Sequence, residues 1–306
     1  MSGGNAISRG YARLLLATSV VTYLLIVMGG VVCVTGSGQG CPDWPRCYGQ
    51  VIPPAQFGAI IEMTHRFLAA LTTPLILIAA VWGWRKYGAI RWVSWPATLA
   101  VGFVLAVVVF GAFAVLTGLS PAVAAIDVGS ALMVLTLVLT AWTVASARLD
   151  DRVLPDRLSL RAPFARLALG TLCAVYVVLV SGVLVAEVGS LARCLGWPQY
   201  GTGIEAREVP GSFPLIRRAF GGLAGILILT TLLRAWRAQD ARTLRAAACA
   251  AVLFLAEVAI GVLMQALGFT MILGALYAMA AVGILGFLVV VAVRAGMETK
   301  PSTAGH

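Results

Sequence analysis

Long apolar runs separated by short polar segments make up most of the chain. Eight runs are long enough to cross a bilayer, because a transmembrane helix needs about 20 largely apolar residues. They cover residues 13–35, 57–83, 93–117, 122–147, 166–188, 213–235, 244–266 and 270–293. Only a short turn separates the third run from the fourth, and the seventh from the eighth. The pattern therefore predicts an all-α integral membrane protein with eight transmembrane helices.

The composition supports this fold class. Of the 306 residues, 60% are hydrophobic and only 11% are charged, and the mean hydropathy is +0.97. These values exclude an ordinary soluble domain. The first run, 13–35, is too long for the apolar part of a cleavable signal peptide and lacks a small-residue cleavage site. We therefore expect it to remain as the first helix.

The positions of the basic residues explain the net charge of +10. Lys and Arg gather in the two terminal segments and in the loops on the same side, whereas the opposite loops hold only Arg46, Arg193 and Arg207. Cytoplasmic loops of membrane proteins are enriched in Lys and Arg. We predict a plasma-membrane protein in the lipid bilayer, with both termini cytoplasmic and no nucleic-acid partner.

The two halves of the chain repeat one plan. The first outer loop has Cys-Pro-Asp-Trp-Pro-Arg-Cys at 41–47, and the second has Cys-Leu-Gly-Trp-Pro-Gln-Tyr at 194–200. An even number of helices per half predicts parallel repeats, related by a pseudo-symmetry axis along the membrane normal. We expect residues 1–150 and 166–306 to form two four-helix bundles, joined by a cytoplasmic linker at 151–165.

An ionisable pair lies inside the second apolar run. Glu62 and His65 are three residues apart, so a helix places both on one face. Apart from His306, His65 is the only histidine in the chain. Ionisable groups are costly at membrane depth and usually functional. A histidine alone is more simply a hydrogen-bonded packing residue, but the neighbouring carboxylate favours a functional site.

Polar residues in the other even-numbered runs form a layer with His65. Asp127, Arg217 and Tyr277 lie at similar counts from the outer ends of their runs. At 1.5 Å per residue, the layer is roughly 9–12 Å below the outer surface. Sites in helical bundles are built from such inward-facing side chains. The alternative is that Arg217 and Tyr277 extend outward to the membrane interface.

Nearly the whole chain resembles the heme A synthase family, with specific motifs in the first half and mainly a shared topology in the second. Residues 29–49, from Gly-Gly-Val-Val-Cys to Cys-Tyr-Gly, are close to the family's first outer loop, and residues 62–66 match its Glu-x-x-His-Arg motif. The resemblance implies an oxidoreductase that converts the methyl group of heme O to the formyl group of heme A for cytochrome oxidase. It implies a substrate heme in the first bundle, with Glu62 beside it as base or electrostatic stabiliser and His65 as axial ligand of the heme iron.

The family would have histidines at the other three layer positions. Here Asp127, Arg217 and Tyr277 stand as the candidate cofactor-binding residues. Arginine stays protonated and cannot ligate iron, whereas tyrosine ligates ferric heme in some proteins. We therefore expect that the second bundle has lost the heme b of the family. The Arg217 charge would then pair with Asp127, Glu187, Glu205 or a heme propionate.

The cysteines fall into three sets. The resemblance implies a disulfide or redox pair between Cys41 and Cys47, and an oxidising outer space permits a disulfide with Cα atoms about 4.4–6.8 Å apart. Cys194 is either a free thiol or paired with one of these. Cys173 and Cys249 lie inside apolar runs, so we expect them to be small packing residues.

Other functions stay open. A non-catalytic heme-binding or scaffold protein of oxidase assembly would explain the missing histidines. A membrane thiol–disulfide oxidoreductase would rest on the outer-loop cysteines, and a transporter would suit parallel repeats. The expected partners are heme O and heme A, together with heme O synthase and cytochrome oxidase subunits.

Overall fold

A computed structural model describes residues 6–117, 120–151, 154, 156–185, 213–238, 240–268 and 270–297. The described helices are α1 (Arg9–Val34), α2 (Phe57–Tyr87), α3 (Arg91–Thr117), α4 (Pro121–Asp150), α5 (Pro163–Val185), α8 (Phe213–Ala238), α9 (Ala241–Leu267) and α10 (Met271–Met297). Eight helices in this part of the chain are long and apolar enough to cross a membrane. The predicted all-α fold class with eight spans is confirmed.

The helices continue past several of the predicted apolar runs. The helix α2 extends to Tyr87 and α10 to Met297, and their last turns contain Arg85, Lys86 and Arg294. Basic side chains favour the C-terminal end of a helix, where the helix dipole is negative. The predicted boundaries were therefore a few residues short at these ends.

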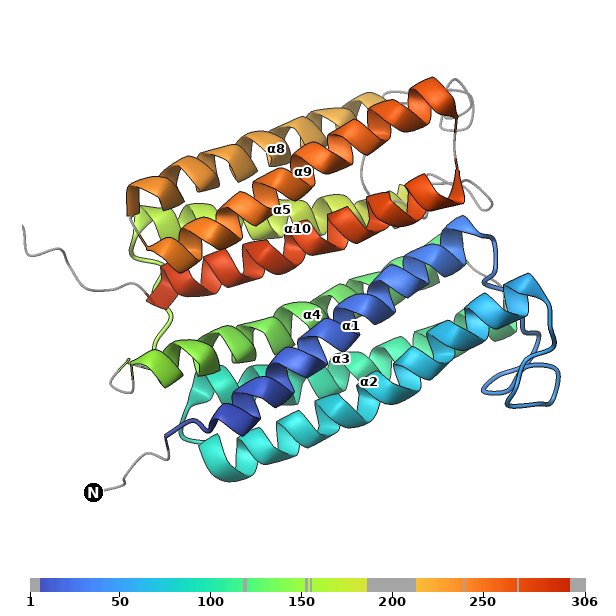
Figure 1. Ribbon diagram of the computed structural model, residues 1–306, viewed down its shortest axis with the longest axis horizontal. Helices are drawn as coiled ribbons and strands as arrows, with labels where there is room; N and C mark the ends of the chain where they lie inside the picture. Colours follow the sequence, from blue (N-terminus) through green and yellow to red (C-terminus); the bar gives the residue numbers. More distant parts are fainter. Residues whose placement is uncertain are drawn as a thin grey trace, which may run out of the picture.

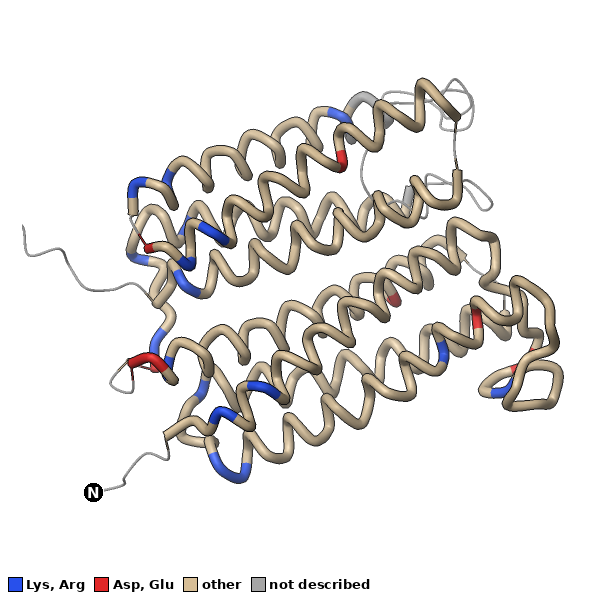
Figure 2. Tube along the Cα trace, viewed as in Figure 1, with Lys and Arg blue, Asp and Glu red and all other residues tan. Residues whose placement is uncertain are grey.

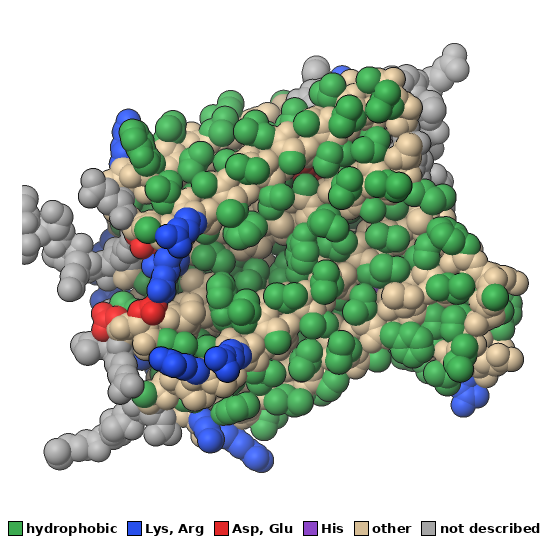
Figure 3. Space-filling view, viewed as in Figure 1, with side chains coloured by type: hydrophobic (Ala, Val, Ile, Leu, Met, Phe, Trp, Pro, Cys, Tyr) green, Lys and Arg blue, Asp and Glu red, His purple; other side chains and the backbone are tan. Residues whose placement is uncertain are grey.

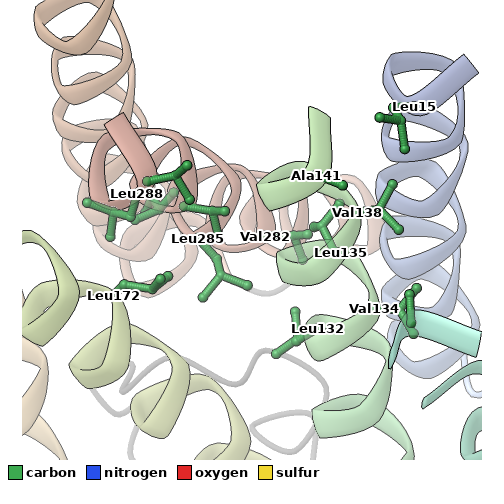
Figure 4. Close-up of a cluster of buried hydrophobic side chains, with 14 of the residues drawn as sticks. Leu15, Leu132, Val134, Leu135, Val138, Ala141, Leu172, Val282, Leu285 and Leu288 are labelled. Carbon is green, nitrogen blue, oxygen red and sulfur yellow. The ribbon is translucent and has the colours of Figure 1, made fainter. Parts of the chain in front are cut away.

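The helices form two groups of four that lie side by side (Figure 1). The first group is α1 to α4, and the second is α5, α8, α9 and α10. The two groups meet where α1 and α4 pack against α5 and α10. Leucines and valines from these four helices interlock in the buried core there, including Leu15, Leu135, Leu172 and Leu285 (Figure 4). Helix packing alone thus brings the two halves of the sequence into one body.

Most Lys and Arg positions lie at the end of the helices where the N-terminus lies, hereafter the basic end (Figure 2). Arg242 of α9 forms an exposed ion pair with Asp150 of α4, which links the two groups. Asp156 accepts hydrogen bonds from the backbone N–H groups of Arg91 and Trp92 and so caps α3. Hydrophobic side chains cover much of the surface between the two ends (Figure 3). This distribution is the one a lipid-embedded protein requires.

Candidate functional site

The segment between α1 and α2 folds into a compact loop closed by a disulfide. Cys41 and Cys47 are bonded, with Cα atoms 4.7 Å apart, within the range predicted from the sequence. Asp43 accepts hydrogen bonds from the backbone N–H groups of Tyr48 and Gly49 at 2.6 and 2.8 Å. The N–H groups of Gly49 and Tyr48 hold the pKa of Asp43 below its usual value. The disulfide and this carboxylate together stabilise the shape of the loop.

Glu62 and Arg66 of α2 attach this loop to the helix. Glu62 is only 3% exposed. Its Oε2 accepts a hydrogen bond of 2.8 Å from the backbone N–H of Cys41, and its Oε1 pairs with the Arg66 guanidinium. Arg66 also donates to the backbone carbonyls of Asp43 and Arg46 at 2.7 and 2.6 Å. Both carboxylate oxygens of Glu62 are therefore occupied by partners that hold the loop in place.

His65 lies one residue before Arg66 but faces a different neighbour. A Cβ atom added at Gly29 of α1 would lie 3.2 Å from Cε1 of His65. The imidazole therefore packs where α1 has no side chain. The imidazole interacts with the backbone of Leu25 on α1, and its buried Nδ1 forms no well-aligned hydrogen bond among the described residues. The predicted pair thus divides its contacts, because Glu62 bonds to the loop and Arg66 while His65 packs against α1.

Asp127 and Tyr277 occupy matching positions in the two groups of helices. A Cβ atom added at Gly111 of α3 would lie 3.8 Å from Oδ1 of Asp127, and one added at Gly261 of α9 would lie 3.8 Å from Cε2 of Tyr277. Both pairs are related by 150 residues in the sequence. The Oδ1 atom of Asp127 is buried and lacks a hydrogen-bond partner in the described part of the chain. Asp127 and Tyr277 therefore each pack against a glycine of the preceding helix.

The predicted environment of Arg217 lies largely outside the described residues. Arg217 is the fifth residue of α8, but its side chain is not described. Glu187 and Glu205, two of its proposed partners, fall in the undescribed segment 186–212. The pairing of Arg217 with a carboxylate stays a prediction.

Glu257 of α9 is a buried carboxylate that the sequence reasoning missed. It is 0% exposed, and neither oxygen has a hydrogen-bond partner among the described residues. It lies four residues before Gly261, so a helix places it on the face that meets Tyr277. A single acidic residue within the apolar run 244–266 was the available signal. It was overlooked because no histidine accompanies it.

The burial of two other cysteines differs from the prediction. Cys173 and Cys249 are free thiols, but both are exposed on their helices and not buried as packing residues. Each is small and apolar enough to face lipid, which removes the need for burial. Cys33, in the last turn of α1, is disulfide-bonded. Cys194 lies outside the described residues, and the bond between the two loop cysteines makes neither available to it.

Comparison with known proteins assigns the family. The model of a family described as cytochrome oxidase assembly protein matches residues 12–217. The chain is 30% identical over 197 residues to the heme A synthase of Bacillus licheniformis, covering 64% of each chain. It is 31% identical over 220 residues to that of Halalkalibacterium halodurans, covering 71% of this chain and 73% of the relative.

A third relative is the heme A synthase of Shouchella clausii, 35% identical over 136 residues, which cover 43% of this chain and 44% of the relative. The residues matched by the family model include the disulfide loop, Glu62, His65 and Asp127. They cover more than half of the chain, and they contain the Glu-x-x-His-Arg motif on α2. This multi-pass membrane protein therefore belongs to the heme A synthase family of cytochrome oxidase assembly proteins.

Proposed function

We propose that the protein oxidises the methyl group of heme O to the formyl group of heme A, with the substrate held in the group α1 to α4. The observation that carries the proposal is His65, the only histidine within the membrane-spanning helices. Its Nδ1 is buried without a hydrogen-bond partner among the described residues, and the imidazole packs against Gly29 of α1. The relatives named heme A synthase support the same reaction.

The residues of the first group fit a heme substrate. Histidine nitrogen is a common axial ligand of heme iron, and an imidazole nitrogen without a hydrogen-bond partner is free to take that role. A second helix of the group adds the Asp127 carboxylate, whose buried Oδ1 has no hydrogen-bond partner in the described part of the chain. The reaction would replace two C–H bonds of the methyl group by one C=O bond, taking one oxygen atom from water, releasing four protons and passing four electrons to an external acceptor, and the iron of the substrate heme would supply the redox chemistry. His65 would position the ring, and Asp127 would accept a hydrogen bond beside it.

The contacts of Glu62 favour an electrostatic role over that of a base. A base must have an oxygen available to take a proton from the substrate. Both oxygens of Glu62 are engaged, one by Cys41 and the other by Arg66. We infer that Glu62 holds the outer loop over the substrate and supplies a fixed negative charge near it.

The second group has few residues that could ligate the iron of a second heme. It contains no histidine, and Tyr277 is the described layer residue with an oxygen able to ligate iron. We infer that heme b is absent there, that the Arg217 charge is paired with a carboxylate, and that any heme in the protein belongs to His65. A buried charge without such a partner would cost several kcal/mol.

We further infer that the protein lies in the plasma membrane with both termini in the cytoplasm. The support is the gathering of Lys and Arg at the basic end (Figure 2). The disulfide loop then lies on the outer side, where oxidising conditions maintain such bonds.

The test is production of heme A in cells. The protein would be expressed together with a heme O synthase in a bacterial strain that lacks its own heme A synthase, and extracted hemes would be separated by chromatography. We expect heme A to appear with the wild-type chain and to be absent with His65→Ala. Pyridine hemochrome analysis of the purified protein should find about one heme per chain.

A second candidate function is a heme-binding scaffold for oxidase assembly. The absence of histidine at three of the four layer positions favours it. Bound heme without any heme A would support the scaffold and reject the synthase. Neither heme nor heme A would reject both.

A further inference from the structure

Two tyrosines join the helix groups through hydrogen bonds of the same kind. The hydroxyl of Tyr23 on α1 donates to the backbone carbonyl of Met279 on α10 at 2.9 Å. The hydroxyl of Tyr176 on α5 donates to the backbone carbonyl of Gly129 on α4 at 3.0 Å. In each case a phenol of one group reaches the backbone of a helix in the other group. No water is available in the hydrocarbon to replace such bonds.

The two bonds are counterparts under the internal repeat. Tyr176 lies 153 residues after Tyr23, which is also the spacing between the Cys-x-x-Trp-Pro motifs of the two outer loops. Met279 lies 150 residues after Gly129. The same spacing separates the glycine contacts of the two layer residues. The two donors, Tyr23 and Tyr176, are thus equivalent to each other, and so are the two acceptors, Gly129 and Met279. Reciprocal contacts of this kind are typical of a two-fold interface.

The acceptor carbonyls lie next to the candidate site. Gly129 comes two residues after Asp127, and Met279 comes two residues after Tyr277. A hydrogen bond to the backbone at this point limits both the rotation of the helix and its movement along its axis. The Tyr176 bond therefore acts on the helix that carries Asp127, whereas the Tyr23 bond acts on the helix that carries Tyr277.

The contact of Tyr176 also depends on the residue that accepts it. A Cβ atom added at Gly129 would lie 3.2 Å from the Tyr176 hydroxyl and 3.5 Å from Cγ2 of Val180. Glycine lets α5 approach α4 closely at this level, and a methyl group there would push the phenol away. The bond is therefore sensitive to a single added carbon atom.

We propose that Tyr176 is a positioning residue for the substrate site. Through its bond to Gly129 it sets the rotation and height of α4, and so the placement of Asp127 relative to His65. The inference rests on the proposed function, in which the substrate heme lies in the first group. It adds that the second group contributes to the reaction by fixing a helix of the first, even without a heme of its own.

Tyr176→Phe and Tyr23→Phe form a matched pair of variants. Each removes one hydroxyl and one bond between the groups, so their losses of thermal stability should be similar. The readouts are the heme content, visible and electron paramagnetic resonance spectra of the purified protein, and the ratio of heme A to heme O in cells. We expect Tyr176→Phe to retain its heme but to shift these spectra and lower heme A formation about three- to tenfold, the effect of one hydrogen bond. Tyr23→Phe should match the wild type in all of them.

Gly129→Ala provides a second route to the same result. It keeps the Tyr176 hydroxyl but displaces it, so the spectra should shift in the same way as in Tyr176→Phe. Equal shifts in Tyr176→Phe and Tyr23→Phe would show a general structural effect and overturn the positioning role. Wild-type spectra and activity in Tyr176→Phe would overturn the inference while the proposed function stands. Absence of heme from the wild-type protein would overturn the proposed function and this inference with it.

Discussion

The backbone N–H of Cys41 donates a hydrogen bond of 2.8 Å to Oε2 of Glu62, so a carboxylate buried in α2 holds the start of the disulfide loop. The other oxygen of Glu62 pairs with Arg66, which in turn donates to two carbonyls of the same loop. The motif on α2 is therefore divided between two tasks. Glu62 and Arg66 anchor the loop, while His65 alone faces α1.

Removal of the Glu62 carboxylate should loosen the disulfide loop. In Glu62→Ala the Arg66 guanidinium loses its buried partner, which costs about 3 kcal/mol in typical proteins. Glu62→Gln keeps an acceptor for the Cys41 N–H and should cost less. Thermal unfolding of the purified protein in detergent would measure both. Thr64→Ala, on the exposed side of the same helix, should change the free energy of unfolding by no more than about 0.5 kcal/mol. Equal stability of Glu62→Ala and Thr64→Ala would contradict the anchoring role.

The heme signal should depend on His65 and not on Tyr277. His65→Ala removes the only histidine of the membrane-spanning helices and should abolish the heme absorption of the purified protein. Tyr277→Phe should leave that absorption intact, because the second group is inferred to hold no heme. A loss of half the heme in Tyr277→Phe would show instead that a tyrosinate-ligated heme survives there.

Gly29→Ala should disturb His65 without unfolding the protein. The added Cβ atom would lie 3.2 Å from Cε1 of the imidazole, which must shift to make room. We expect clearly lower heme content at little cost in thermal stability. Gly102→Ala in α3 is the matched control, since no atom lies within 4 Å of its Cβ position. Wild-type heme content in Gly29→Ala would show that the place of His65 against α1 has no bearing on heme binding.

The oxidation state of the cysteines can be mapped directly. Alkylation of the unfolded but unreduced protein, followed by peptide mass spectrometry, should label Cys173 and Cys249. Cys33, Cys41 and Cys47 should react only after reduction, since all three are in disulfides. Quantitative labelling of the two loop cysteines before reduction would show that they are free thiols and contradict the disulfide.

Asp240 should contribute to stability in a pH-dependent way. It caps α9 through the Thr243 N–H at 3.0 Å and pairs with Arg294 at 3.0 Å. Burial raises its pKa, but the hydrogen bonds from Thr243 and Arg294 outweigh this effect and lower the pKa to about 2. The folded-state pKa is thus below the unfolded value of about 3.9. The stabilisation is therefore complete above about pH 4 and is lost as the pH falls through about 2.

The variant Asp240→Ala should accordingly be less stable than the wild type by about 1 kcal/mol at neutral pH. The difference should be constant down to about pH 4 and shrink only below it. Denaturant unfolding in detergent at a series of pH values would measure it. Asp150→Ala removes the exposed pair with Arg242 and should cost less than about 1 kcal/mol. A difference for Asp240→Ala that varies between neutral pH and about pH 5 would be inconsistent with this assignment.

Much of this protein is determined by local properties of the sequence. The number of spanning helices follows from the length of the apolar runs. Each run is long enough to cross the bilayer by itself, whatever the other runs do. The spacing of Cys41 and Cys47 permits a small closed loop, and the cost of a polar group in lipid marks His65 and Asp127 as candidate site residues. The same cost applies to Glu257, but the sequence prediction did not include this residue because no histidine lies near it.

Only the tertiary structure decided which groups these residues contact. Helical spacing places Glu62 beside both His65 and Arg66, but the fold of the loop above α2 selects Arg66 and the Cys41 N–H as its partners. The Tyr23 hydroxyl finds its acceptor at Met279, 256 residues away in the sequence. Periodicity along one helix determines which face is buried, whereas the partner on that face depends on how separate helices pack. That packing is the sum of many long-range contacts and is not a property of any single segment.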